Sequence, residues 1–99
     1  YRSHSESITI ETEREITPGK ARELLSKAAG VKLIDDLENE KYPMPLDSSD
    51  QDLIYVGRVR KDISSENSLV LWCCGDQVRK GAATNAVQIA EVLAKENLI

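Results

Sequence analysis

The sequence predicts a small α+β domain in which a mixed or antiparallel sheet packs against two main helices. The chain has 99 residues, of which 40% are hydrophobic, enough to form the core of one domain. Several segments show the alternating or continuous hydrophobicity of strands, and two others carry apolar residues at helical spacing. Near the N-terminus, strand, helix and strand patterns follow one another within about 30 residues, which is typical of a compact α+β unit.

The charge balance excludes some functions. Seventeen acidic and 13 basic residues give a net charge of −4, and no basic run is present, which argues against nucleic-acid binding. No apolar stretch approaches the roughly 18 residues of a membrane helix. The first residues lack the pattern of a secretory signal. We expect a cytoplasmic protein, because two adjacent thiols in an apolar run are typical of a reducing compartment. The chain does not begin with Met, and we expect it to be a piece of a longer one.

The first elements are a strand and a helix. Residues 6–14 alternate, with Ile8 and Ile10 on one face and glutamates on the other, which predicts a half-buried strand. Thr17 and Pro18 are a typical N-cap and first residue of a helix, predicted over 18–29. Its apolar stripe comprises Ala21, Leu24, Leu25 and Ala28. Gly30 is expected at a left-handed C-cap.

A short strand over 31–34 and a long connection over 35–52 come next. The residues before Pro43 and Pro45 are pushed towards extended conformations, and turn-forming residues follow. We expect this connection to lie on the surface. A loop of this length in a small domain is often functional or part of an interface.

The second half predicts a hairpin and a helix. Residues 53–60 form an extended run, and residues 69–74 are apolar on both faces, which is typical of a covered, central strand. The final helix is expected over 83–95. Its apolar stripe is too wide for the partners that this chain offers, so we expect it to pack on something outside the chain. The stripe comprises Ala82, Ala86, Val87, Ile89, Ala90, Val92 and Leu93.

Few residues could carry chemistry. His4 is the only histidine, a residue type that suits acid–base catalysis, although a lone surface histidine usually has no function. Gln77 follows the buried strand, where its amide can reach a cleft or remain solvated. Cys73 and Cys74 are adjacent in an apolar run, which favours two buried, reduced thiols over a disulfide or a nucleophile. Arg58 and Arg60 are expected on one strand face and Lys61 on the other, and such cations are most simply solvated or paired.

The beginning of the last helix carries one further weak signal. Small residues and an amide, 81–85, lie beside its N-terminus, a position that attracts anions such as a phosphate-bearing ligand. Their spacing matches neither a Walker nor a dinucleotide-binding motif.

Three motifs together resemble the C-terminal part of the aspartate-semialdehyde dehydrogenase family, with the bacterial branch most similar. They are His4-Ser5-Glu6 before a strand, the run Val56-Gly57-Arg58-Val59-Arg60-Lys61-Asp62, and the run Gly75-Asp76-Gln77-Val78-Arg79-Lys80-Gly81-Ala82-Ala83-Thr84-Asn85-Ala86. The similarity runs in order from residue 1 to residue 98.

The resemblance implies an activity. The family reduces L-aspartyl 4-phosphate to L-aspartate 4-semialdehyde with NADPH and releases phosphate, in lysine, diaminopimelate, threonine and methionine biosynthesis. A cysteine nucleophile forms a thioester with the substrate. By position, His4 is the catalytic acid/base, Gln77 lines the substrate site, and Asn85 lies near the nicotinamide end of the cofactor. No metal is implied.

The resemblance also implies an architecture. Residues 1–80 belong to a catalytic and dimerisation domain of the type found in glyceraldehyde-phosphate-dehydrogenase-like two-domain enzymes. Residues 81–99 form a C-terminal helix that packs on an NADP-binding domain. The expected assembly is a homodimer, with a tetramer as the alternative.

Several parts of the family pattern are missing from this chain. It has no Gly-x-Gly-x-x-Gly motif after a strand, so the dinucleotide-binding half is absent. Cys73 and Cys74 do not match the nucleophile, and Arg2 does not match the arginine that binds the substrate carboxylate. We therefore expect these residues alone to be inactive, and His4 to be exposed and frayed at the terminus.

Two other functions remain open at this point. The chain could be a stand-alone dimerisation or interaction module without catalysis. It could also belong to a different aldehyde or acyl-phosphate reductase on the same scaffold, although the long run 75–86 favours aspartyl phosphate.

Overall fold

The computed structural model describes residues 2–98 and contains one four-stranded mixed sheet with the order β1-β4-β3-β2. β4 pairs antiparallel with β1 and β3, whereas β2 pairs parallel with β3. The elements in chain order are β1 (His4–Glu11), α1 (Pro18–Lys27), β2 (Val31–Leu33), α2 (Pro45–Ser48), β3 (Ile54–Lys61), β4 (Ser68–Gly75), the π-helical turn η1 (Arg79–Ala83) and α3 (Thr84–Lys95). The predicted α+β class with a mixed sheet is confirmed.

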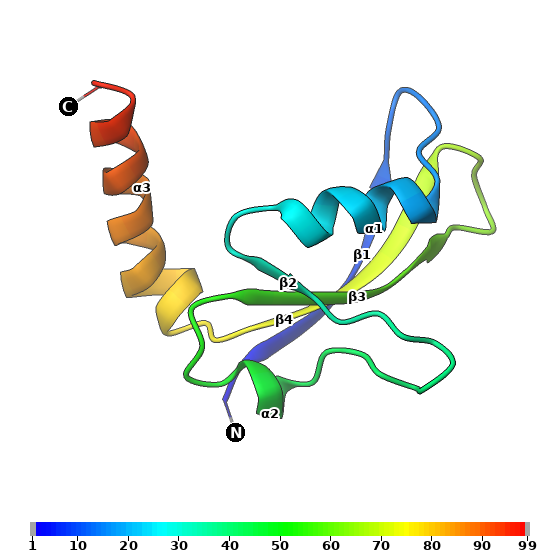
Figure 1. The fold of residues 1–99 in the computed structure, drawn as a ribbon, viewed down its shortest axis with the longest axis horizontal. Helices are drawn as coiled ribbons and strands as arrows, with labels where there is room; N and C mark the ends of the chain where they lie inside the picture. The colour runs from blue at the N-terminus through cyan, green and yellow to red at the C-terminus, as the bar shows by residue number, and fades with distance from the viewer. Residues whose placement is uncertain (1, 99) are drawn as a thin grey trace.

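The strand β4 lies in the interior of the sheet, as its continuous hydrophobicity predicts. The hairpin that it forms with β3 is also confirmed. One face of the sheet packs against α1, and Figure 1 shows this helix and α2 on opposite sides of the strands. The buried core beneath α1 comprises Ala21, Val56, Val59, Leu69 and Leu71.

The helix α1 begins as predicted, because the Thr17 side chain accepts a hydrogen bond from the Lys20 amide and Pro18 occupies the first turn. It ends at Lys27, before the expected residue 29. Gly30 has the predicted positive φ of 78°, but the C-cap is Ala28, in an extended conformation. The left-handed residue therefore turns the chain into β2 and does not cap the helix, which corrects the expectation for Gly30.

The strand β1 begins and ends earlier than the predicted 6–14. Both the amide and the hydroxyl of Thr12 donate to the Asn67 carbonyl, and the chain leaves the sheet there. Ile8 packs against the core as expected, but Ile10 is 40% exposed because it lies near the end of the sheet.

The connection over 35–52 does not lie wholly on the surface, as was expected. It contains α2, and both Pro43 and Ser48 are fully buried. The Trp72 indole Nε1 donates to the Pro43 carbonyl at 2.9 Å, which fixes this segment against β4. The connection thus covers the sheet face opposite α1.

A bulge in β3 departs from simple strand alternation. The register with β4 shifts between Gly57 and Arg60, and Arg58 has a φ of 51°. The buried Asp35 carboxylate holds the bulge, since it accepts from the amides of Arg58 and Val59 and from Arg22 Nε. Because the bulge includes Arg58, the two-residue spacing by itself does not place Arg58 and Arg60 on one face of the strand.

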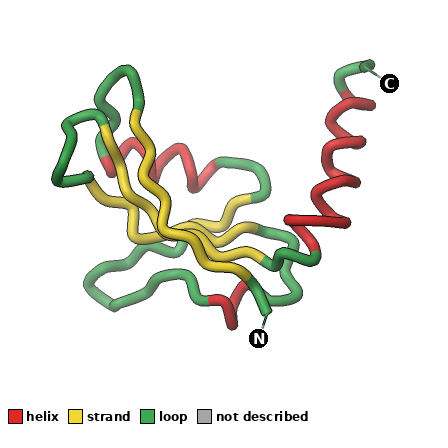
Figure 2. The backbone as a smooth tube through the Cα atoms, turned by 180° about the vertical axis from the view of Figure 1, so that it is seen from behind, coloured by secondary structure: helices red, strands yellow, loops and turns green. Residues whose placement is uncertain are grey.

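The last helix stands apart from the rest of the structure. Figures 1 and 2 both show α3 projecting from the sheet, and none of its residues is buried. Within η1 the backbone kinks at Ala82, whose φ and ψ are −144° and −106°. The predicted helix is confirmed, and its apolar side chains Val87, Ile89 and Val92 are more than half exposed. No helix of the described chain is long and apolar enough to cross a membrane.

Gly57 provides a test of how tightly the 35–52 connection packs on the sheet. A Cβ at this position would overlap the Ile34 carbonyl oxygen and lie 2.5 Å from Pro43 Cδ. We expect Gly57→Ala to lower the free energy of unfolding by about 3 kcal/mol, because backbone atoms cannot make room. Gly19→Ala is the control, since no atom lies within 4 Å and the residue is helical. It should raise stability by about 0.5 kcal/mol. Chemical denaturation measures the unfolding free energy of both variants. Equal values for Gly57→Ala and Gly19→Ala would contradict the close packing of the 35–52 connection on Gly57.

Candidate functional site

His4 and Gln77, which are distant in sequence, line the same cleft of about 240 Å³. One wall comes from β1 and the other from the turn that follows β4. The other lining residues are Glu6, Ile54, Cys73, Gly75, Asp76, Lys80 and Gly81. The cleft therefore brings together two of the three site residues that the sequence predicts.

The β1 wall is held by the sheet. His4 is exposed, as expected, but it is paired with Gly75 of β4 and is not frayed at the terminus. Gly75 has no side chain, and a Cβ there would overlap Ile54 Cδ1. The glycine thus lets Ile54 lie across the strand beneath the cleft.

Gln77 is half-buried and already has a partner. Its Oε1 accepts from the Ser3 amide at 2.9 Å, which joins the turn after β4 to the residue before His4. Its two amide N–H groups make no hydrogen bond within residues 2–98, so they can donate to a ligand in the cleft.

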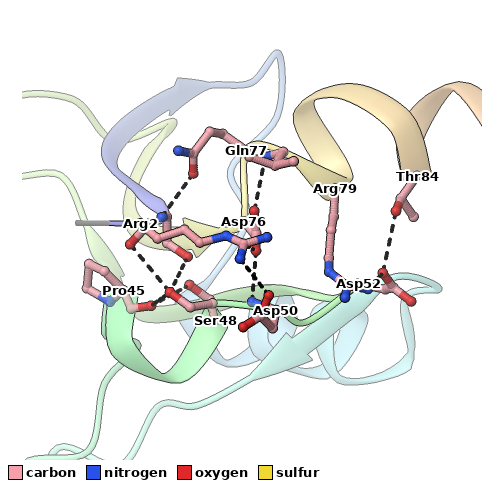
Figure 3. Close-up of polar contacts among 12 residues, drawn as sticks. Arg2, Pro45, Ser48, Asp50, Asp52, Asp76, Gln77, Arg79 and Thr84 are labelled. Atoms are coloured by element: carbon pink, nitrogen blue, oxygen red, sulfur yellow. Dashed lines mark hydrogen bonds and ion pairs between the residues drawn. The ribbon is translucent and has the colours of Figure 1, made fainter.

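A buried carboxylate lies behind the cleft. The Asp76 side chain is fully buried, and its Oδ2 accepts from the Asp50 amide at 2.8 Å and from Arg2 Nε at 3.0 Å. Its Oδ1 accepts from the Val78 amide at 3.0 Å. Figure 3 shows Arg2 between Asp76 and Asp50, and its Nη1 reaches Asp50 Oδ1 at 2.7 Å. One carboxylate thereby joins the N-terminal segment, the turn after α2 and the turn after β4.

The donors around Asp76 keep it ionised. Burial by itself raises the pKa of this carboxyl group, since it disfavours the charged form. The amides of Asp50 and Val78 and the Arg2 guanidinium outweigh that effect, so the pKa of Asp76 lies below its ordinary value of 3.8.

A second polar cluster ties the beginning of α3 to the same corner. Arg79 Nη1 donates to Asp52 Oδ1 at 3.0 Å, and the Thr84 hydroxyl donates to the same oxygen at 3.5 Å (Figure 3). The ion pair with Asp52 raises the pKa of Arg79. From the side of η1, Lys80 donates to Gln88 Oε1 at 2.7 Å.

Asn85 is the predicted site residue that the cleft does not include. It is half-buried in the first turn of α3, which has Ala83 as its N-cap and no side-chain capping bond. Within residues 2–98, Asn85 does not line the cleft that contains the other two predicted site residues, His4 and Gln77.

The cysteines match only in part the expectation of two buried, reduced thiols. Both are free, but only Cys74 is buried, whereas Cys73 is half-buried because it lines the cleft. Burial, and next the charge of Glu6, raise the pKa of Cys73, so its thiol stays protonated at neutral pH. Within residues 2–98, no group of three or more His, Cys, Asp or Glu side chains could hold a metal ion.

A larger cleft of about 450 Å³ lies at the β3 bulge. Its main polar groups are already paired, because Arg22 binds Asp35 and the Arg58 guanidinium lies 5.9 Å from the centre of the Tyr42 ring. It contains neither a histidine nor a cysteine. The smaller cleft is therefore the better candidate for chemistry.

Residues 1–80 match the family model described as semialdehyde dehydrogenase, dimerisation domain. The chain belongs to this family.

Its curated relatives are aspartate-semialdehyde dehydrogenases. The chain is 54% identical over its full length to the protein of Aquifex aeolicus, and 57% identical over 91% of its length to that of Campylobacter jejuni. Among solved structures, aspartate semialdehyde dehydrogenase II from Vibrio cholerae, complexed with ASA, matches 96% of the chain at 38% identity with a TM-score of 0.86. The chain spans 29%, 26% and 28% of these three proteins, respectively.

Sequence reasoning missed Asp76 as a site residue of this semialdehyde dehydrogenase domain. An acidic residue between an apolar strand and a helical turn is a usable signal, because such a side chain often accepts from the amides of the turn. Its partners Arg2 and Asp50 are distant in sequence, and no local pattern identifies them.

The lowered pKa of Asp76 makes stability depend on pH. Because the folded pKa lies below the unfolded one, the carboxylate stabilises the fold above pH 3.8, and this contribution is lost as the pH falls through the folded pKa. Asp76→Asn should therefore lower the unfolding free energy near pH 7 much more than near pH 2. Asp47→Asn, an exposed carboxylate in α2, is the control and should have little effect at either pH. Equal losses for Asp76→Asn at both pH values would contradict the assignment.

Proposed function

We propose that the whole protein of which these residues form part is an aspartate-semialdehyde dehydrogenase. It converts L-aspartyl 4-phosphate into L-aspartate 4-semialdehyde and phosphate in the cytoplasm, using NADPH. The product serves lysine, diaminopimelate, threonine and methionine biosynthesis. The naming of the curated relatives supports this reaction over another acyl-phosphate reduction on the same scaffold.

The observation that carries the proposal is the cleft shared by His4 and Gln77. An imidazole ring can both accept and donate a proton through its nitrogens, so His4 can accept the proton of a cysteine thiol supplied by the rest of the protein and return it later. The Gln77 carbonyl oxygen accepts from the Ser3 amide, which supports the proposal that its N–H groups remain available to donate to substrate. An interaction module without catalysis has no need for this pair.

NADP is the cofactor of the whole protein in this proposal, but the described residues do not fit it by themselves. The parallel strands β2 and β3 are joined by the 35–52 connection and the short α2, without the glycine-rich turn and long helix that bind a dinucleotide. Asn85, beside the uncapped start of α3, is the residue that we assign to the nicotinamide end. We accordingly expect the 99 residues alone to be inactive.

The remaining assignments concern the assembly. We propose that residues 1–80 belong to a dimerisation domain and that residues 81–99 pack on the NADP-binding domain. The extent of the family match and the exposed apolar face of α3 support this division. A homodimer is the expected assembly because the matching family is described as a dimerisation domain, and a tetramer would be built from two such dimers.

Replacement of His4 tests the proposed function. In the whole enzyme, His4→Ala should lower kcat by roughly 10²- to 10⁴-fold with a much smaller change in KM, because a positioned acid/base acts mainly on the transition state. Steady-state kinetics with aspartate semialdehyde, phosphate and NADP measures the effect. Ser7→Ala, an exposed residue on the opposite face of β1, is the matched control and should leave kcat unchanged. A near-normal kcat for His4→Ala would reject the role.

A further inference from the structure

The two walls of the cleft are connected through one buried group. Arg2 lies two residues before His4, and Val78 directly follows Gln77. The Asp76 carboxylate binds both, since Oδ2 accepts from Arg2 and Oδ1 accepts from the Val78 amide. Its backbone carbonyl also accepts from the amides of Arg79 and Lys80, which begins the turn that forms the second wall.

The N-terminal segment has few other attachments before β1 begins. The Ser3 amide donates to Gln77, and the Ser3 hydroxyl lies 3.1 Å from that of Ser49. Ser3 itself has a positive φ of 77°, a conformation that a serine adopts only when its surroundings enforce it. The Arg2 side chain, which bridges Asp76 and Asp50, is the charged contact that can enforce it.

We propose that Asp76, acting through Arg2, is a positioning residue that sets the orientation of His4 relative to Gln77. The proposal rests on the acid/base role of His4 proposed above. Asp76 and Arg2 do not transfer protons to substrate in this account. They hold the backbone on either side of the cleft, so that the imidazole meets the reacting thiol at the productive distance.

The chain provides a chemical duplicate of this arrangement at a distance from the cleft. Asp35 is also buried, and it also accepts from two backbone amides and one arginine Nε. The Arg22 and Arg2 side chains are equally exposed, at 42% and 41%. Removal of either guanidinium should therefore cost similar stability, whereas only Arg2 is attached to the segment that carries His4.

The test uses Arg2→Gln and Arg22→Gln in the whole enzyme, because both side chains are partly exposed and their replacement leaves the amide bonds of each carboxylate intact. We expect Arg2→Gln to lower kcat roughly 10-fold or more with little change in KM, since misplacement of an acid/base by about 1 Å is costly. Arg22→Gln should change kcat less than about 2-fold at a similar shift in Tm. Asp76→Asn should change the kinetics in the same way as Arg2→Gln, with a lower kcat and little change in KM.

A double-mutant cycle separates positioning from general destabilisation. In the His4→Ala background, Arg2→Gln should change kcat less than about 2-fold, because the group that it positions is gone. Two outcomes would overturn the positioning role alone. In one, Arg2→Gln lowers kcat no more than Arg22→Gln does. In the other, Arg2→Gln lowers kcat by the same factor whether His4 is present or replaced by Ala. A near-normal kcat for His4→Ala would instead overturn the acid/base role and the positioning role together.

Discussion

The arrangement of the cleft depends on the solvation of one carboxylate. Asp76 is removed from water at the end of the central strand, and an unpaired charge there would cost several kcal/mol. Two backbone amides and the Arg2 guanidinium replace the lost water. Each donor belongs to a different segment, so the requirement to solvate one charge fixes the N-terminus, the turn after α2 and the turn after β4 relative to one another.

The sheet provides the rigid part of this frame. Because β4 is paired on both sides, the position of its end at Gly75 is well defined. The position of the residues that follow Gly75 is set by that strand end. His4 is opposite Gly75 in the register, and Gln77 begins the next turn. The cleft thus forms at the end of the sheet, where residues from three strands, the turn after β4 and η1 converge. The helix α3 projects away from it with its apolar face exposed.

Most of the secondary structure could be predicted because its signals are local. Thr17 and Pro18 mark a helix start, and the apolar run ending at Cys74 marks a covered strand. The bulge at Arg58 could not be predicted, since it depends on Asp35, which is distant in sequence. His4 and Gln77 were predicted from motifs, and they line one cleft. The proposed role of Asp76 could not be predicted, because it depends on tertiary partners that no local pattern reveals.

Hydrogen exchange at the amides of Asp50 and Val78 tests the central claim most directly. Both amides lie outside the helices and strands, and both donate to the Asp76 carboxylate. Both amides should exchange at least about 100-fold more slowly than an unprotected peptide, and Asp76→Ala should remove this protection while β4 remains protected. Exchange of these two amides at the unprotected rate in the native protein would contradict the claim.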